Sequence, residues 1–354
     1  MPYLSTPRRP VRLPVDVSAH LAAVRLKLPD VLTVTNPKTK DNAIRHNLPG
    51  RALANACRLD ADGSIPARGH LPALRELAAS LGVLDKALAV DFCPFATPAC
   101  REACLNWAGR GGLGDAVALA RGRRSLSMLL DPVADARATL YSIAWHHRRA
   151  AAAGRRLAVR LAGTDEGAHW HRLRVPVSVA DAQLLSHRFG LEVTPTDWEG
   201  SPALGATLGE ILRDSVTLYD YSKGTLSHLQ AKRSAGWDVT ASFRTDAPDA
   251  VGHALSVAPS FRLAVPVAIR KGEPIPRTLT LIQGDTSLEL PCVDGDATDD
   301  RFREADRLTA VILSAKRSRG ADPLIARPFF LNGPEPGQTE SVTTLSDGIA
   351  RLQW

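Results

Sequence analysis

The sequence has no long apolar segment of the kind that spans a membrane or directs secretion. No stretch of the 354 residues approaches the roughly 18 consecutive apolar residues of a membrane-spanning helix. The first residues, MPYLSTPRRPVRLPVD, include basic side chains, but the apolar segment of a secretory signal does not follow them. We therefore expect a cytoplasmic protein that has no membrane partner.

Cysteine is also scarce, and its distribution is uneven. The chain has five cysteines, and three of them, Cys93, Cys100 and Cys104, lie within twelve residues at the spacing C-x6-C-x3-C. An odd number of cysteines does not fit complete internal pairing, and thiols stay reduced in the cytosol. A cysteine cluster in such a chain indicates metal or redox chemistry rather than a disulfide framework.

The charge of the chain is biased toward the basic side. Lys and Arg number 44 and Asp and Glu 37, which gives a formal net charge of +7. Basic residues stand in short groups: Arg8-Arg9, Arg121 with Arg123-Arg124, Arg148-Arg149, Arg155-Arg156, and Lys316-Arg317 with Arg319. Guanidinium groups bind phosphate in a bidentate manner, so nucleic acid is a candidate partner. The alternative is a composition bias toward Arg, Ala, Gly and Pro, of the kind that a GC-rich genome produces.

Several apolar segments end in a polar turn, and helical or mixed segments separate them. They are residues 86–92, 155–167, 215–224, 236–248 and 307–320. Short apolar runs are typical of buried strands, and alternating strands and helices are typical of a parallel sheet. In α/β barrels the carboxyl ends of the strands carry the functional site. We therefore expect an α/β fold with an incomplete (β/α)6 barrel.

Two longer segments interrupt this alternation. Residues 172–213 contain a helical pattern near 179–189. Residues 259–293 contain consecutive strands, with turns at Lys271-Gly272 and Gly284-Asp285. Strands that follow one another through short turns pair in antiparallel fashion, so we expect an antiparallel β insertion there.

The two ends of the chain differ from the middle. Residues 1–30 are rich in Pro and Arg, and we expect an irregular basic arm. Residues 31–333 are expected to form one barrel-like domain that starts with a short strand in 31–40, and residues 334–354 a polar, loosely held tail. Further helices are expected at 71–82, 115–130 and 133–153.

Residue type and spacing leave three interpretations of the cysteine cluster open. A zinc site usually has four ligands, often in C-x2-C pairs, and His146 or His147 is a candidate for the fourth. A structural interpretation treats the cysteines as small buried residues in a turn. In the third interpretation the thiolates hold a [4Fe–4S] cluster and leave one iron open to a substrate or cofactor.

The order of segments around the cysteines resembles that of radical S-adenosylmethionine (SAM) enzymes. Their three cysteines lie in the loop after the first strand of a (β/α)6 partial barrel, usually at the spacing C-x3-C-x2-C. Here the apolar segment 86–92, the cysteine loop and a helix at 115–130 follow in the same order. The resemblance implies that SAM binds the open iron and that the cluster's electron cleaves it to a deoxyadenosyl radical.

Polar residues after two later strands fit a SAM pocket of this kind. Gly163, Thr164 and Asp165 follow the second strand, where radical SAM proteins bind the methionyl amino group, and a carboxylate suits an ammonium group. Asp220 and Lys223 follow the next strand and are candidates for binding ribose or polar groups of a substrate. An ordinary turn is the alternative interpretation of the segment GTDEG.

An acidic segment, VDGDATDDRF, contains Asp294, Asp296, Asp299 and Asp300. A calcium loop is excluded because the closing Glu of that motif is missing. The remaining interpretations are a magnesium site with nuclease chemistry and a solvated turn that caps a following helix.

Separated motifs of the chain resemble, in order, those of the phage "gene product 88" domain family. The motifs are NPKT, CPFATPACREACLNWAGRG, RLAGTDE, YDYSK and DGDATDDRF, followed by AVILSAK. The resemblance extends from about residue 33 to residue 320. It implies that the three cysteines belong to a shared motif and that the chain originates from a phage or a mobile element. It assigns no catalytic residue.

The sequence therefore predicts an iron–sulfur protein with a [4Fe–4S] cluster on Cys93, Cys100 and Cys104. Its expected activity is that of a radical-SAM-like enzyme that acts on a nucleic-acid or nucleotide-type substrate. The competing prediction is a zinc-containing, nucleic-acid-binding protein without catalysis, whose DNA binding would depend steeply on salt.

Overall fold

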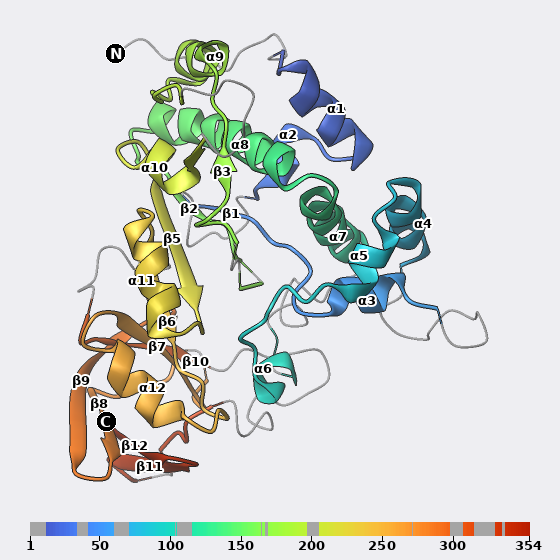
Figure 1. Ribbon diagram of the computed structural model, residues 1–354. Coiled ribbons are helices and arrows are strands. Elements are labelled where there is room, and N and C mark those ends of the chain that lie inside the picture. Colours follow the sequence, from blue (N-terminus) through green and yellow to red (C-terminus); the bar gives the residue numbers. More distant parts are fainter. Residues whose placement is uncertain are drawn as a thin grey trace. The chain divides into compact units, whose positions relative to one another are not determined.

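The chain folds into two compact units, whose elements are labelled in Figure 1. Unit 1 comprises residues 1–93, 115–218 and 235–237, and unit 2 comprises residues 94–114, 219–234 and 238–354. The computed structural model describes residues 12–33, 42–59, 71–102, 104, 115–163, 165–166, 169–196, 205–270, 272–297, 307–314, 330–334 and 337–354.

Unit 1 is largely helical. Its helices are α1 (Val15–Ala23), α2 (Leu28–Val31), α3 (Ala52–Cys57), α4 (Pro72–Ser80), α5 (Leu84–Ala89), α7 (Asp115–Leu130), α8 (Pro132–Ala152), α9 (Val179–Phe189) and α10 (Leu208–Leu212). Its strands are β1 (Asn42–Ile44), β2 (Ala158–Arg160), β3 (Arg174–Val175), β4 (Ala206–Thr207) and the first two residues of β5 (Thr217–Ser222). Across the described part of the whole chain, no helix is long and apolar enough to cross a membrane.

Capping residues explain the bounds of several helices. The Asp131 side chain accepts hydrogen bonds from two backbone N–H groups in the first turn of α8. Ser178 and Asp181 form a capping box at the start of α9, and Gly190, with φ of 66°, ends that helix in the left-handed conformation. The structure confirms the predicted helices at 71–82 (α4), 115–130 (α7), 133–153 (α8) and 179–189 (α9).

Parallel pairing joins the strands of the main sheet in unit 1. Strand β1 pairs with β2, and β2 pairs with the start of β5, both in parallel. Strands β3 and β4 form a separate antiparallel pair within the segment 172–213. The predicted interruption of the alternation at 172–213 therefore contains a two-stranded sheet as well as α9 and α10.

Unit 2 contains a larger sheet with parallel and antiparallel parts. Its elements are α6 (Pro98–Glu102), the rest of β5, α11 (Leu226–Ser234), β6 (Asp238–Ser242), α12 (Ala250–Val257), β7 (Arg262–Val267), β8 (Thr278–Gln283), β9 (Thr286–Asp294), β10 (Ala310–Ser314), β11 (Glu340–Leu345) and β12 (Gly348–Gln353). Strands β5, β6, β7, β10 and β9 are parallel neighbours in that order, and β8, β12 and β11 continue the sheet in antiparallel fashion. The α/β class with a mostly parallel sheet is thus confirmed.

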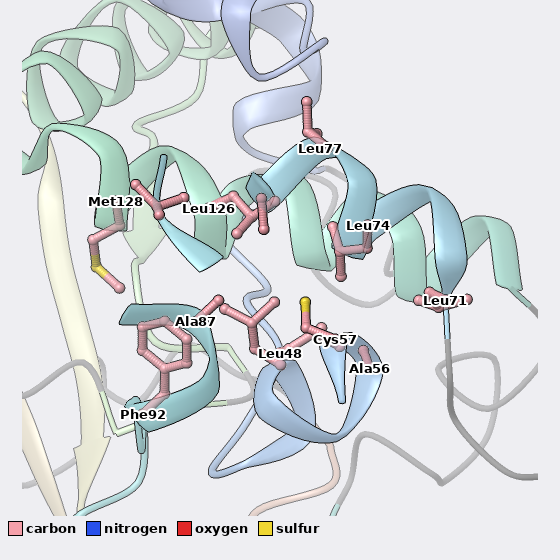
Figure 2. Close-up of a cluster of buried hydrophobic side chains, with 13 residues drawn as sticks. Leu48, Ala56, Cys57, Leu71, Leu74, Leu77, Ala87, Phe92, Leu126 and Met128 are labelled. Carbon is pink, nitrogen blue, oxygen red and sulfur yellow. The ribbon is translucent and has the colours of Figure 1, made fainter. Parts of the chain in front are cut away.

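A cluster of buried apolar side chains joins α3, α4, α5 and α7 of unit 1 (Figure 2). Leu74 of α4 and Leu126 and Met128 of α7 belong to it, and so does Phe92. Fully burying a leucine or phenylalanine side chain stabilises a protein by about 1.5–3 kcal/mol. The cluster therefore fixes the residue that directly precedes Cys93.

The strand predicted at 86–92 is wrong, because residues Leu84–Ala89 form helix α5. Ala87 is buried, and Leu84 and Leu88 pack against the apolar cluster, which is the i, i+3, i+4 spacing of a helix face. A short apolar run does not by itself distinguish a strand from a helical segment. The segment that leads into the cysteine loop is therefore not a strand of the sheet.

The antiparallel insertion predicted at 259–293 is correct only in its second half. Strands β8 and β9 form an antiparallel hairpin whose turn contains Gly284, with φ of 56°. Strand β7 instead pairs in parallel with β6 and β10, and all six of its residues are buried. A continuous apolar run buried on both faces is typical of a central parallel strand.

The two ends of the chain contain more regular structure than we expected. Helices α1 and α2 lie in the segment predicted to be an irregular arm. Strands β11 and β12 form a hairpin in the segment predicted to be a loose tail, and β12 pairs with β8. Of the strand predicted in 31–40, residues 34–40 lie outside the described residues, and Thr33 forms a single bridge to Ile44.

Acidification should destabilise unit 1 through His146, a buried residue of α8. Only 4% of its surface is exposed, and burial lowers its pKa from 6.5 to about 4. The pKa of His146 in the folded protein lies below its value in the unfolded chain, so the neutral imidazole favours the folded state. This contribution to the unfolding free energy is complete above about pH 6.5 and is lost as the pH falls toward 4, a difference of about 3 kcal/mol. Chemical denaturation at several pH values should show a weaker pH dependence of the unfolding free energy for His146→Gln. The exposed His187 provides the control: His187→Gln should leave the pH dependence unchanged, and an equal effect of both would contradict the assignment.

Gly209 of α10 should not tolerate a side chain. A Cβ atom at this position would overlap the backbone carbonyl oxygen of Ala235, and backbone does not move aside as a flexible side chain does. We expect Gly209→Ala to lower the free energy of unfolding by about 1–3 kcal/mol in denaturant titrations. Gly252→Ala in α12 is the control, because its Cβ would meet only the side-chain ends of Gln283 and Asp347. A loss in the control as large as that in Gly209→Ala would rule out the backbone overlap as the cause.

Candidate functional site

Cys93 lies at the carboxyl ends of β1 and β2 in unit 1. The backbone N–H of Gly50, a few residues after β1, donates to Cys93 Sγ at 3.2 Å. Phe92 N–H donates to the Gly50 carbonyl at 3.1 Å, and Glu166 N–H, which follows β2, donates to the Phe92 carbonyl at 3.1 Å. Open α/β sheets bind ligands outside the carboxyl ends of their strands. This half of the cysteine motif is therefore held at the edge of the sheet where a functional site is expected.

Gly163 and Asp165, two of the predicted SAM-binding residues, connect the ends of β2 and β1. Gly163 N–H donates to the Arg45 carbonyl at 2.8 Å. Asp165 is 8% exposed, and its Oδ2 accepts a hydrogen bond from Asn47 Nδ2 at 2.9 Å. Both residues thus have a structural task, while Thr164 lies outside the described residues. Their assignment to a SAM pocket stays a prediction.

Arg45, directly after β1, is the centre of a buried polar network in unit 1. Its guanidinium is fully buried and lies 2.9 Å from Asp135 Oδ2. It also donates to Thr139 Oγ1 at 2.9 Å and to the Arg124 carbonyl at 3.0 Å. Ser127 Oγ donates to the same Asp135 carboxylate. Sequence reasoning missed this network, because its members lie about 80 to 95 residues from Arg45 along the chain and no local pattern connects them.

In unit 2 the segment that carries Cys100 lies at the carboxyl ends of β5 and β6. Asp246, four residues after β6, accepts a hydrogen bond from Ala99 N–H at 2.9 Å. The ring of Phe95 lies 5.1 Å from the ring of His228, which belongs to α11 and so follows β5. Thr97 directly precedes helix α6, and its Oγ1 accepts a hydrogen bond from Cys100 N–H at 3.2 Å. Asp246 and His228 thus hold the segment that carries Cys100. The sequence indicated a polar turn at the end of 236–248, but it did not indicate this role.

Asp220, predicted to bind ribose or substrate, forms a buried ion pair instead. Lys232 Nζ of α11 lies 2.6 Å from Asp220 Oδ2, and both side chains are about 1% exposed or less. This pair attaches α11 to β5. Lys223 is half-buried in the loop between these two elements. The role of Asp220 and Lys223 in binding a ligand stays a prediction.

The loop after β5 packs closely against two histidines. His253 Nε2 of α12 lies 2.9 Å from the Gly224 carbonyl oxygen. A Cβ at Gly224 would overlap the ring of His228, so the backbone of this loop passes directly over that histidine. The loop after β5, α11 and α12 therefore form a tightly packed platform in unit 2, and the segment of Phe95 contacts it through His228.

The five cysteines differ in their surroundings. Cys57 is buried, and burial raises its pKa to about 11; burial also raises the pKa of Cys292 to about 12. In both cysteines the shift disfavours the thiolate, which is the form that binds metal. Cys93, Cys100 and Cys104 are half-buried, and so is Cys292.

No three His, Cys, Asp or Glu side chains within the described ranges are grouped so that they could hold a metal ion. Cys93 belongs to unit 1, whereas Cys100 and Cys104 belong to unit 2. His146 and His147, the candidates for a fourth zinc ligand, lie in α8 of unit 1, where burial lowers the pKa of each. The binding of one metal or cluster by the three cysteines stays a prediction.

The acidic segment after β9 connects β9 to β10. Asp296 Oδ2 accepts a hydrogen bond from Ser314 N–H at 2.8 Å and another from the Ser314 hydroxyl, while Asp294 Oδ1 accepts from Asp296 N–H at 2.7 Å. These residues, with Arg270 and Glu273, line a cavity of about 220 Å³. Asp299 and Asp300 lie outside the described residues. These bonds are those of a turn, and a magnesium site stays a prediction.

Removing the Asp246 carboxylate should loosen the segment that carries Cys100. In Asp246→Ala the Ala99 N–H loses a charged acceptor, and a hydrogen bond to a charged group contributes about 1.5–3 kcal/mol. We expect Cys100 to be alkylated about tenfold faster or more, as measured by peptide mass mapping after iodoacetamide treatment. Asp249→Ala is the matched control, since this nearby exposed carboxylate pairs with Arg244. Equal alkylation rates in the two variants would show that Asp246 does not position the helix.

Comparison with known proteins gives no relative from which to assign a family. No family model, no curated protein and no solved structure matches the chain. The resemblance to the "gene product 88" domain family therefore stays a prediction, and the chain's own residues are the basis for assigning a function.

Proposed function

We propose that the chain is an iron–sulfur protein in which Cys93, Cys100 and Cys104 together hold one [4Fe–4S] cluster. One observation carries the proposal. In unit 1 the segment of Cys93 is bonded to residues that follow β1 and β2, and in unit 2 the segment of Cys100 contacts residues that follow β5 and β6. In each unit, taken separately, the cysteine motif thus lies at the carboxyl ends of parallel strands.

The chemistry of the donors suits such a cluster. Three thiols within twelve residues are enough to hold a [4Fe–4S] cube and leave one iron open. The Gly50 N–H that donates to Cys93 Sγ would stabilise the negative charge of a thiolate, and hydrogen bonds of this kind tune cluster potentials. Cys57 and Cys292 lie far from the motif in the sequence, and burial raises the pKa of each thiol.

The fold adds support to a radical-SAM-like arrangement. Parallel strands neighbour one another in chain order in both units: β1, β2 and β5 in unit 1, and β5, β6, β7 and β10 in unit 2. Strands follow this order in (β/α) barrels, so we propose that they form an incomplete barrel. The helix α5 before the cysteines is a departure from the radical SAM order.

The residues predicted to bind SAM give the proposal less support than the three cysteines do. Asp165 is bonded to Asn47 and Asp220 is paired with Lys232, so each carboxylate already has a partner within the chain. We therefore propose the cluster without including SAM in its mechanism. When bound, a cluster with an open iron supplies one-electron chemistry or a Lewis-acid position. The chain's own part is to bind it by three thiolates and to fix their segments through Gly50, Asp246 and His228.

Single substitutions of the cysteines test the proposal. Cys93→Ala, Cys100→Ala and Cys104→Ala should each lose iron and acid-labile sulfide, because each variant lacks one of the three proposed thiolate ligands. Wild type, Cys57→Ala and Cys292→Ala should retain both after anaerobic reconstitution. Iron and sulfide are measured per chain, and the cluster is followed by its absorption near roughly 400 nm.

Three results would contradict the cluster. They are full iron content in any of the three variants, loss of iron from both controls, and a wild-type protein that takes up no iron. Zinc without sulfide, lost in the same three variants, would instead favour the alternative of a zinc-containing, nucleic-acid-binding protein.

A further inference from the structure

Five arginines gather where α8 and α9 end in unit 1. Arg148 and Arg149 lie in the last turns of α8, Arg155 and Arg156 in the turn that leads to β2, and Arg188 near the end of α9. The Arg148 Nη1 group donates to the Arg188 carbonyl at 2.8 Å, so the ends of the two helices are in contact. Figure 1 shows α9 beside the last turns of α8. We call these five residues the arginine face.

Most of the arginine face is exposed. Arg149, Arg155, Arg156 and Arg188 are exposed, and Arg148 is half-buried. The carboxylate of Glu192, four residues after Arg188, accepts a hydrogen bond from Ser186 Oγ at 2.7 Å, and the five arginines outnumber it. Cations at the end of a helix stabilise its dipole, and the contact from Arg148 to the Arg188 carbonyl has this role. Five arginines at two adjoining helix ends are more than the stabilisation of the two helix dipoles requires.

An aromatic side chain orients one of these arginines. The Arg149 guanidinium lies 4.7 Å from the ring centre of Trp145, which is half-buried one turn earlier in α8. Stacking on an aromatic face holds a guanidinium in a fixed plane, and a planar guanidinium binds phosphate oxygens in a bidentate manner. The arrangement thus resembles the basic, aromatic-supported surfaces that follow a nucleic-acid strand.

The other arginine groups of the chain do not offer a comparable surface within the described ranges. Arg121 and Arg124 are 7% and 4% exposed, and Arg124 donates to the carbonyls of Asp30 and His46. Both side chains are thus mostly enclosed within unit 1 and expose little surface, and the prediction that this group contacts nucleic acid stays a prediction. Arg8-Arg9 and the group at 316–319 lie outside the described residues.

We propose that the arginine face binds the phosphate backbone of nucleic acid without reading its sequence. The choice of arginine supports phosphodiester recognition, because its fork matches phosphate geometry. A membrane surface fits less well, since helices that bind lipid expose large apolar side chains next to their basic ones. Of the exposed large apolar residues in the described chain, Val179 is the one that belongs to α8 or α9, and it begins α9, whereas Arg188 lies near the end of that helix. The proposal does not depend on the iron–sulfur cluster.

Fluorescence anisotropy with a labelled single strand and a labelled duplex tests the proposal. Arg155→Ala/Arg156→Ala should weaken binding about tenfold or more at about 0.1 M salt, because two phosphate contacts are lost. The slope of log K against log salt should become shallower by about two. Arg270→Ala/Arg277→Ala is the control, since it removes the same charge from two exposed positions in unit 2. It should leave both the affinity and the slope nearly unchanged.

The remaining outcomes of this experiment would each overturn a stated part of the proposal. Equal weakening in the two double variants would show that net charge alone attracts nucleic acid and would overturn the arginine face. Absence of binding by the wild type, or binding to anionic lipid vesicles but not to DNA or RNA, would overturn the choice of partner. Because the assay uses protein with or without iron, failure of the cluster proposal leaves this result interpretable.

Discussion

The buried pair of Arg45 and Asp135 is the interaction on which the rest of unit 1 depends. Arg45 follows β1, and its bonds reach the carbonyl of Arg124 in α7 and two side chains of α8. Its backbone carbonyl receives Gly163 N–H after β2. Removing one partner of a buried ion pair costs about 3–5 kcal/mol, because the other charge stays buried without compensation. Arg45 therefore connects the first strand to the two long helices through its guanidinium and to the end of the second strand through its backbone carbonyl.

The position of Cys93 depends on a second set of contacts in unit 1. The cysteine is fixed through Gly50 and Phe92, and Phe92 is held in turn by the apolar cluster and by Glu166 N–H after β2. In unit 2, Asp246 and His228 have the corresponding task for the segment of Cys100. The segments of Cys93 and Cys100 thus lie outside the strands of the sheet, and residues that follow buried strands hold them in place.

Sequence signals within a few neighbouring residues are sufficient to predict helices whose bounds depend on capping residues and prolines. The capping box at Ser178 and the proline at the start of α8 mark helices that the structure has within a residue or two of the expected bounds. The sequence mispredicts the segment 86–92 because a short apolar run fits both the two-residue period of a strand and the 3.6-residue period of a helix. It mispredicts the tail because β11, with the sequence ESVTTL, is mostly polar, and because the hairpin of β11 and β12 joins the sheet through β8, a strand far away in the chain.

The contacts that build the candidate site cannot be predicted from residues that are neighbours in the sequence. Asp246 and Ala99 are 147 residues apart, and Arg45 and Asp135 are 90 apart. Nothing near either residue in the chain indicates its partner, since the pairing depends on how helices and strands pack. The cysteine motif is visible because its members are close in sequence, whereas the side chains that position it are not.

The pairing of β8 with β12 has a consequence for how unit 2 is made in the cell. Thr278 and Gln353 are 75 residues apart, so β8 leaves the ribosome well before the strand that will cover its free edge. Until then the β8–β9 hairpin presents unpaired backbone groups, which is the feature of edge strands that promotes association between chains. A nascent chain stalled in this interval is therefore one for which a chaperone that shields strand edges would matter most.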